Sequence, residues 1–254
     1  MLHRFEPDLI LVKPVYLHWL LRCARDWGLT LPKIQAVLSC YQYLSVIQRR
    51  AIESHLGAPV YNYYFATDLA GSRLGVDSHC GRMHVREDHS YVEVVSDSGT
   101  TKPAGEIGAL LFTAHANRVM PMVRYQVGDV GRLLSGGDDS CPIAHWQVLE
   151  LHGRAKDMLF IRGRWWTTKE IDDVMAELPG IDFYKVYQVD EGSLRVDFVP
   201  SPTVPFDEAF ASSRLSDALA IPAIELSQVK RLEAEVSMKF RMTQCTYRQA
   251  PSSP

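Results

Sequence analysis

Apolar residues recur every three to four positions in four stretches of the chain, and this spacing predicts four helices. The predicted helices cover residues 14–28, 45–57, 167–179 and about 206–219. Pro14 in the first turn and Gly28 after the last turn mark the ends of the first helix. Two of the other helices start with the capping-box spacing, a Ser or Thr followed three residues later by Gln or Glu, at Ser45 and Thr167.

Short runs rich in β-branched and aromatic residues predict strands between these helices. The predicted strands are residues 34–38, 60–65, 91–95, 107–112, 122–125, 130–134, 158–161, 183–189 and 194–199. Asp190–Ser193 has the composition of a hairpin turn between the last two strands. The organisation changes after Gly153-Arg154, where one strand, one helix and two strands form a compact βαββ unit. We therefore expect an α/β protein with two domains, residues 1–154 and 155–254, the second ending in a polar tail.

The composition excludes several classes of protein. The apolar fraction of 46% and the charged fraction of 22% are ordinary for a soluble globular protein. A net charge of −3 gives no electrostatic reason to expect nucleic acid or an anionic membrane as a partner. No apolar run approaches the ~20 residues of a membrane span, and the first residues do not form a secretory signal. The 5 cysteines are an odd number spread along the chain, so we expect the reducing cytoplasm and no disulfide framework.

An ordered series of short motifs resembles one enzyme family. The runs Tyr125-Gln-Val-Gly-Asp129, Gly153-Arg-Ala-Lys-Asp157 and Ile161-Arg-Gly163 are similar to the signature series of adenylate-forming enzymes. Within that superfamily, the opening Glu6-Pro-Asp segment and the Gly105-Glu-Ile-Gly108 block resemble the phenylacetate–CoA ligase group and related capsule-biosynthesis proteins. The similarity runs in the family's order over about residues 5–200.

The resemblance implies both a fold and a reaction. Residues 1–154 would form part of the large domain, which binds nucleotide and acyl group, and residues 155–254 a small α+β lid domain. Such an acid–thiol ligase uses ATP with Mg²⁺ to convert a carboxylate into acyl-AMP, and coenzyme A then takes the acyl group. No Ser/Thr/Gly-rich phosphate loop precedes residue 60, so the chain resembles a C-terminal portion. A complementary chain, or a start upstream of the assigned one, would have to supply that loop.

The resemblance also assigns nucleotide-binding roles. Asp129 would accept the ribose hydroxyls, although an Asp that only caps a turn is the alternative. Arg154 would contact ribose or phosphate, with a surface arginine as the alternative. In Tyr64-Phe-Ala-Thr67-Asp68 the family has the adenine-stacking aromatic residue, a phosphate-contacting Thr and a magnesium-supporting carboxylate. Phe65 replaces the family's Gly where the backbone would approach the nucleotide closely, and Asp68 replaces its Glu.

Three further residues receive roles from the same resemblance. Lys156 stands at the hinge between the two domains, and family members rotate the small domain there between the two half-reactions. Gly163 would lie on the path of the CoA pantetheine, or would be an ordinary turn glycine. Lys239 is the candidate for the family's catalytic lysine, but it lacks the preceding Gly, so a polar tail lysine is the alternative.

Two Cys-His pairs suggest a separate metal site. Cys80 and His84, and Cys141 and His145, have the same spacing and offer the thiolate and imidazole ligands that tetrahedral zinc prefers. Some relatives use a Cys, a His and a later Cys-x-Cys, whose last Cys corresponds to Ile143 here. The alternative is that the two pairs are unrelated loop and core residues.

Three hypotheses for function therefore compete. The chain could be a ligase half completed by another segment, a degenerate homologue that acts as a partner or regulator, or a non-catalytic module that binds an acyl group or CoA. The aromatic run at residues 61–65 is consistent with an aryl acid such as phenylacetate as the substrate. A buried strand explains the same run, and a medium or long acyl chain is the alternative substrate.

Overall fold

The computed structural model describes residues 2–69, 72–115, 119–135, 141–236 and 239–246. Its main feature is a nine-stranded mixed sheet in the order β1-β2-β3-β4-β5-β9-β8-β7-β6. The first three strands pair in parallel and the later neighbours pair antiparallel. The strands are β1 Leu9–Val12, β2 Ala36–Ser39, β3 Val60–Ala66, β4 Ser72–Asp77, β5 Met83–Val85, β6 Ser90–Val95, β7 Gly108–Ala114, β8 Tyr125–Leu134 and β9 Val148–Arg154.

Two helices connect the three parallel strands, as parallel pairing requires. The helix α2 spans Pro14–Asp26, with its proline in the first turn, and α3 spans Val46–Leu56. Ser45 and Gln48 form the predicted capping box of α3, and Gly57 ends that helix in the left-handed conformation. A short helix, α1 at Leu2–Phe5, precedes β1, and the 3-10 turn η1 at Thr67–Leu69 follows β3.

Residues after Arg154 form a smaller assembly, which we call the C-terminal part (residues 155–246). It starts with the 3-10 turn η2 at Ala155–Asp157 and a two-stranded hairpin, and it contains a four-stranded sheet in the order β14-β13-β12-β15. Its elements are β10 Leu159–Ile161, β11 Arg164–Trp166, α4 Thr168–Met175, β12 Ile181–Asp190, β13 Ser193–Pro200, α5 Glu208–Leu219, β14 Ala223–Gln228 and β15 Thr243–Cys245.

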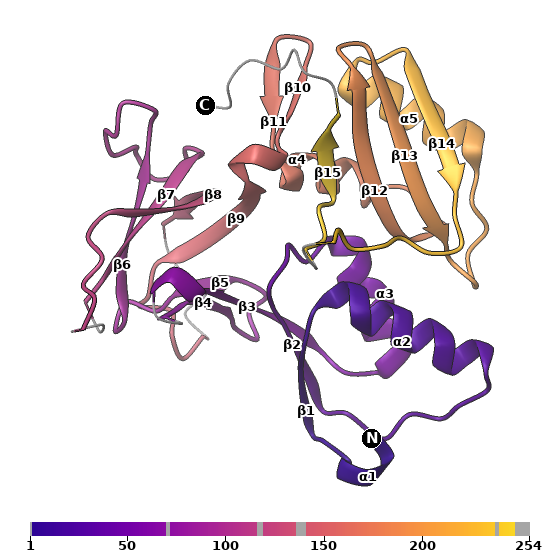
Figure 1. Cartoon of the computed structure of the whole chain (residues 1–254), viewed down its shortest axis with the longest axis horizontal. Helices are drawn as coiled ribbons and strands as arrows, with labels where there is room; N and C mark the ends of the chain where they lie inside the picture. The colour runs from indigo at the N-terminus through magenta and orange to yellow at the C-terminus, as the bar shows by residue number, and fades with distance from the viewer. Residues whose placement is uncertain (1, 70–71, 116–118, 136–140, 237–238, 247–254) are drawn as a thin grey trace.

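The C-terminal part packs on the helices of the N-terminal part (residues 2–154). Figure 1 shows α2 and α3 beside the lower end of the four-stranded sheet. The largest apolar cluster contains Val15 of α2 and Ile47 of α3 together with core residues of the C-terminal part, such as Phe183 and Met175. Trp19 of α2 also donates its indole N–H to the carbonyl of Leu232, at 3.1 Å. The two parts therefore share buried apolar surface in this arrangement.

The structure confirms the predicted α/β class and all four helices, with the third ending earlier, at Met175. It corrects the separate strands predicted at 122–125 and 130–134, because β8 is one strand that begins only at Tyr125. Pro121 cannot donate to a ladder, and Arg124 has a φ of 50°, so the chain turns before β8. The division into domains at residue 154 stays a prediction, and residues 247–254 of the predicted tail lie outside the described part.

Every helix in the described part of the chain is too short or too polar to traverse a lipid bilayer.

Candidate functional site

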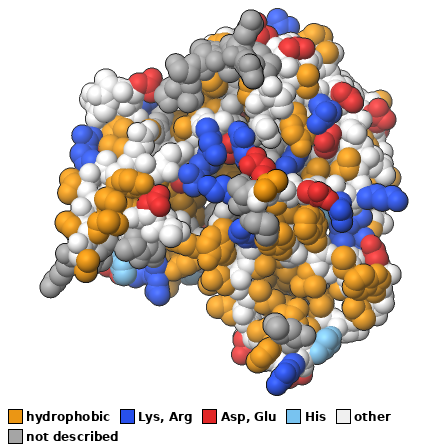
Figure 2. All heavy atoms as spheres, viewed as in Figure 1, with side chains coloured by type: hydrophobic (Ala, Val, Ile, Leu, Met, Phe, Trp, Pro, Cys, Tyr) orange, Lys and Arg blue, Asp and Glu red, His pale blue; other side chains and the backbone are white. Residues whose placement is uncertain are grey.

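A cavity of about 340 Å³ lies where the nine-stranded sheet meets the C-terminal part. Seven residues singled out by the sequence line it: Tyr64, Thr67, Asp68, Asp129, Arg154, Lys156 and Lys239. They come from β3, η1, β8, the end of β9, η2 and the segment before β15. On the face shown in Figure 2, basic side chains gather near the middle and acidic ones lie next to them. The fold thus brings the predicted nucleotide-binding residues to one site.

Asp129 has a polar partner on each of its carboxylate oxygens. It is 9% exposed. Its Oδ1 pairs with Nε of Arg154 at 2.8 Å, and its Oδ2 accepts the hydroxyl proton of Tyr64 at 2.6 Å. Burial raises the pKa of the Asp129 carboxyl, and the charge of Arg154 and the bond from Tyr64 oppose that rise. Arg154 also donates to the carbonyl of Val127, at 3.2 Å. The fold thus joins two residues that the sequence singled out separately.

The carboxylate of Asp68 stands at the exposed end of the cavity. Its Oδ2 accepts a hydrogen bond from the hydroxyl of Tyr125 at 3.0 Å, so two of the sequence motifs meet here. Thr67 and Asp68 lie together in η1, directly after β3. Phe65 does not leave an open approach to the backbone, because its ring packs edge-on against Tyr41 with centroids 4.8 Å apart. Aromatic side chains therefore form one wall of the cavity.

The segment around Lys156 is held by a bond that the sequence did not reveal. Arg241 donates from Nε to Oδ1 of Asp157 at 2.5 Å and from Nη2 to the carbonyl of Lys156 at 3.3 Å. Burial raises the pKa of the Asp157 carboxyl, and the Arg241 charge opposes this. Lys156 and Lys239 are both exposed. No sequence signal identifies Arg241, because its partner lies 84 positions away and only the fold brings them together.

A second group missed by the sequence is Gln42, which also lines the cavity. Both polar atoms of its amide are buried and have no hydrogen-bond partner within the described part of the chain. An amide offers two donor hydrogens and an acceptor oxygen, and leaving such a group unbonded is costly.

Gly163 does not belong to this cavity. It lies at the tip of the β10–β11 hairpin with a φ of +76°, and a side chain there would meet no atom within 4 Å. The antiparallel pairing of Leu159 with Trp166 carries the hairpin tip away from η2. Its predicted role on a CoA path stays a prediction.

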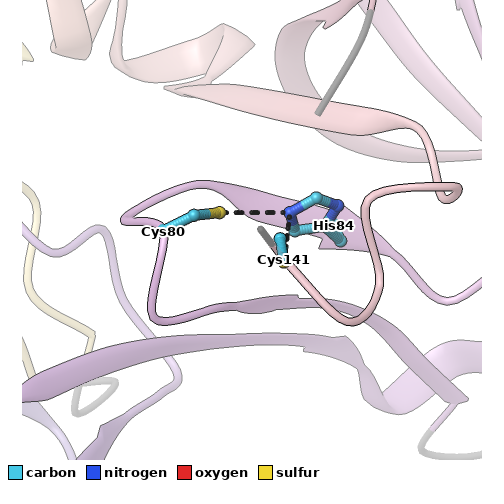
Figure 3. A group of neighbouring side chains, drawn as sticks. All are labelled: Cys80, His84 and Cys141. Atoms are coloured by element: carbon cyan, nitrogen blue, oxygen red, sulfur yellow. Dashed lines mark hydrogen bonds between the residues drawn. The ribbon is translucent and has the colours of Figure 1, made fainter. Parts of the chain in front are cut away.

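Three of the four predicted metal ligands meet at a separate place. Cys80, His84 and Cys141 each offer one ligand atom, and these atoms lie within 4.8 Å of one another (Figure 3). Nε2 of His84 is 3.4 Å from Sγ of Cys80 and 3.7 Å from Sγ of Cys141. Zinc bonds of ~2.05 Å to nitrogen and ~2.3 Å to sulfur at a tetrahedral angle would place these atoms ~3.6 Å apart. The spacing therefore fits two ligand pairs of a tetrahedral ion.

The contacts that hold the ligand side chains also fit a metal. Nδ1 of the fully buried His84 lies 3.4 Å from the carbonyl of Trp146, which favours the tautomer with Nε2 free to ligate. Ser78 Oγ lies 2.9 Å from Sγ of Cys141.

The prediction that His145 is the fourth ligand is wrong. His145 does not belong to the cluster that the described residues form, and its exposed ring packs against Trp146 with centroids 5.7 Å apart. The cause is a tight turn after Cys141, in which the N–H of Ala144 bonds to the carbonyl of Cys141 at 2.9 Å. The matched Cys-x3-His spacing brings Cys80 and His84 together but separates the second pair.

Comparison with known proteins places this geometry in context. No family model matches the chain. The phenylacetate-coenzyme A ligase of Thermus thermophilus is 27% identical over 98% of this chain and 58% of its own length. The enzyme of the same name from Escherichia coli is 30% identical over 63% of this chain and 37% of its own length. The chain thus spans less than two thirds of the length of the curated relatives that it matches.

Solved structures show the same fold. A 2-hydroxyisobutyryl-CoA ligase in its postadenylation state superposes with a TM-score of 0.78 at 21% identity, over 98% of this chain and 56% of that one. The same ligase in its thioesterification state gives a TM-score of only 0.55, over 96% of this chain and 56% of that one. The relative placement of the two parts here therefore resembles the first state more closely. The similarity to adenylate-forming CoA ligases expected from the sequence motifs is confirmed.

Proposed function

Since the chain is a relative of the phenylacetate–CoA ligases within the adenylate-forming superfamily, we propose that its cavity binds the nucleotide of an acyl adenylate. The observation that carries this proposal is the buried contact set of Asp129 with Tyr64 and Arg154. A carboxylate has about four lone-pair sites, so one bond on each oxygen leaves room for two ribose hydroxyls. Arg154 would neutralise Asp129 and remain close to the α-phosphate.

The same cavity supports roles for the remaining residues. Tyr64 would stack near adenine, and the hydroxyl of Thr67 would contact phosphate. Asp68, whose carboxylate is exposed and reaches Tyr125, would support the Mg²⁺ that shields the phosphates of ATP. Lys239 is exposed in the cavity, so its ammonium could approach the developing charge on the α-phosphate.

The reaction proposed is that of an acid–thiol ligase. A carboxylate oxygen attacks the α-phosphorus of ATP, the bond to pyrophosphate breaks, and acyl-AMP results. The thiol of CoA then attacks the acyl carbon and AMP leaves. The aromatic wall formed by Tyr41, Tyr63 and Phe65 favours an aryl acid such as phenylacetate, with a medium or long acyl chain as the alternative. Rotation of the C-terminal part about Lys156 would separate the two steps.

The proposal includes a complementary segment that carries the phosphate loop. β1 is the end strand of the nine-stranded sheet in the described part of the chain, and Leu9 and Leu11 are 51% and 52% exposed on it. A free strand edge with exposed apolar residues is suited to pairing with another strand. We place the complementary chain there. A cytoplasmic location, where the free cysteines stay reduced, belongs to the same proposal.

The alternative is a degenerate homologue that acts as a partner or regulator, or that binds an acyl group or CoA without catalysis. Phe65 and the shortened carboxylate of Asp68 favour it, because both alter the nucleotide site. Carboxylate-dependent exchange of labelled pyrophosphate into ATP separates these functions. We expect exchange only when a chain with a phosphate loop is added. Exchange by the isolated chain would contradict degeneracy, whereas no exchange in either case, with CoA still bound, would favour the binding module.

A structural zinc is proposed for the cluster of Cys80, His84 and Cys141, with a water or a further ligand completing the tetrahedron. The ligands come from the turn between β4 and β5, from β5 itself and from the segment before β9. When bound, the ion would cross-link these segments, and the role of these residues would be structural rather than catalytic.

A further inference from the structure

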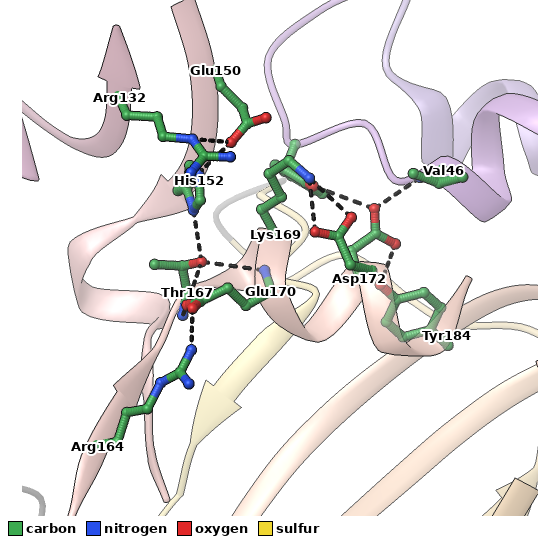
Figure 4. A network of polar contacts seen from close by, with 12 residues as sticks. Val46, Arg132, Glu150, His152, Arg164, Thr167, Lys169, Glu170, Asp172 and Tyr184 are labelled. Carbon is green, nitrogen blue, oxygen red and sulfur yellow. Dashed lines mark hydrogen bonds and ion pairs between the residues drawn. The ribbon is translucent and has the colours of Figure 1, made fainter. Parts of the chain in front are cut away.

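The carboxylate of Asp172 joins the C-terminal part to the N-terminal part. Asp172 lies on α4 and is fully buried. Its Oδ1 accepts a hydrogen bond from Tyr184 of β12 at 2.6 Å, within the C-terminal part. Its Oδ2 crosses to the N-terminal part, where it accepts from the backbone N–H of Val46 at 2.8 Å and from the hydroxyl of Tyr43 at 3.3 Å. Figure 4 shows Asp172 between Val46 and Tyr184.

The N–H of Val46 needs this acceptor. Val46 is the first residue of α3, and the first N–H groups of a helix have no carbonyl partner within the helix. The capping box serves other groups of the same turn, since Ser45 accepts from the N–H of Gln48. The positive end of the α3 dipole also favours a carboxylate at this point. Asp172 of the C-terminal part therefore supplies the hydrogen-bond acceptor that the N–H of Val46 lacks within α3.

Tyr43 connects the same carboxylate to the candidate site. Its side chain lines the cavity of about 340 Å³, while its hydroxyl donates to Asp172. The cavity wall at Tyr43 is thus fixed only while the C-terminal part is docked on α3, in the placement seen here. Arg50 of α3 adds a second contact across the same boundary, to the carbonyl of Ala176 at 3.1 Å.

We propose that Asp172 is a positioning residue that couples docking of the C-terminal part to the shape of the cavity wall. In the docked arrangement it orders Tyr43 and the start of α3. When the C-terminal part turns away, the N–H of Val46 and the hydroxyl of Tyr43 lose their acceptor together. This inference concerns docking and holds whether or not the chain forms an adenylate.

The surroundings of Asp172 make the docking dependent on pH. Burial raises the pKa of its carboxyl to about 6, although the bonds from Tyr184, Val46 and Tyr43 oppose the rise. Asp173 on α4 raises it further, and Glu150 of β9 is the other acid near Tyr43. No Lys or Arg in the described ranges forms an ion pair with Asp172. The basic residue on the same helix, Lys169, pairs with Asp173.

The direction in which docking changes with pH depends on which arrangement binds more protons. An undocked carboxyl returns toward its ordinary pKa of about 3.9, so the docked arrangement binds more protons between the two values. Docking is therefore favoured as the pH falls and weakened as it rises through about 6. Between about pH 5 and about pH 7.5 the ratio of docked to undocked chain should fall about tenfold.

Hydrogen exchange of the Val46 amide in the full chain tests this directly, because within the described residues that amide donates to the carboxylate of Asp172. After correction for the intrinsic rate, we expect its protection to fall about tenfold between about pH 5 and about pH 7.5. Asp172→Asn keeps the shape of the side chain and an oxygen acceptor but cannot ionise. In this variant the protection of the Val46 amide should change less than about twofold over that range. Asp173→Asn is the matched control, because Asp173 is half-exposed and pairs with Lys169. This variant should keep the step, with its midpoint moved to lower pH because the charge of Asp173 raises the pKa of Asp172.

Two results would overturn the proposal: an Asp172→Asn profile that follows the wild type, or a Val46 amide unprotected at every pH. If Asp172→Asn does not fold, Tyr184→Phe gives the answer instead. It removes one bond that lowers the pKa of Asp172, so the midpoint of the step should move to higher pH. An unchanged midpoint in that variant would equally contradict the coupling.

Discussion

At the scale of single residues, the main finding is that charged side chains are buried where the two parts meet, and each has a named partner. Asp129 is bonded to Tyr64 and Arg154, Asp157 to Arg241, and Asp172 to polar groups from both parts. Burying a charge is costly unless hydrogen bonds replace water. These residues are therefore the ones whose substitution should change function or docking rather than solubility.

The metal cluster gives a prediction at the same scale. Purified chain should retain about one zinc ion, and Cys141→Ser should lose most of it, because three ligands leave little affinity when one is removed. Cys23→Ser is the control, since Cys23 is exposed and belongs to α2. Because zinc requires deprotonated ligands, the affinity should weaken as the pH falls. Elemental analysis that finds no zinc, even after reconstitution, would refute the site.

At the scale of elements, the end of β9 fixes how α4 is placed. His152 lies 3.0 Å from Thr167, the residue that caps α4, and 2.7 Å from Glu150 (Figure 4). Gly153 follows with a φ of +99°, and a Cβ there would lie 2.7 Å from the Cβ of Thr168. The close approach of β9 to α4 is therefore possible only with glycine at this position.

Gly153→Ala should therefore destabilise the fold in two ways. The left-handed backbone is strained for alanine, and the new methyl group collides with Thr168. We expect the free energy of unfolding to fall by about 3 kcal/mol. Gly57→Ala is a control with the same backbone strain but open space, at a φ of +63°, and should cost about 1 kcal/mol. Chemical denaturation of both variants measures the difference, and equal losses would exclude the predicted collision.

The sequence predicted local features well and long-range ones poorly. Both capping boxes and the hairpin turn before Ser193 involve residues a few positions apart, and all are present. The family motifs singled out Asp129 and Arg154 as separate nucleotide-binding candidates, and the ion pair between them is seen only in the structure. By contrast, the bonds of Arg241 to Asp157 and of Asp172 to Val46 join residues 84 and 126 positions apart. No local pattern encodes such contacts, because the first forms only when the C-terminal part folds and the second only when the two parts are docked.

The metal ligands also show that spacing in the sequence does not determine which side chains meet in the fold. The equal spacing of the two Cys-His pairs predicted a symmetric site, but the turn after Cys141 separates His145 from it. Similarly, β1 was not predicted, because its four residues gain their strand conformation from parallel pairing with β2. A local turn decided the first outcome, and pairing between strands decided the second.

At the scale of the whole molecule, the chain combines a nine-stranded sheet, a docked C-terminal part and a cavity between them. It spans 58% of the length of its Thermus thermophilus relative. The residues of β1 do not line the cavity, although residues after β2 and in β3 do. Nucleotide binding can therefore be measured apart from turnover.

The central claim is that Asp129 and its neighbours bind the nucleotide, and equilibrium binding of AMP to the purified chain tests it most directly. Asp129→Asn keeps the shape of the side chain but loses its charge, and we expect binding at least about tenfold weaker than in the wild type. Asp97→Asn makes the same charge change on an exposed turn and should leave the affinity unaltered. Saturable AMP binding that is lost only in Asp129→Asn is the predicted result, and equal affinity in all three proteins would contradict the proposed site.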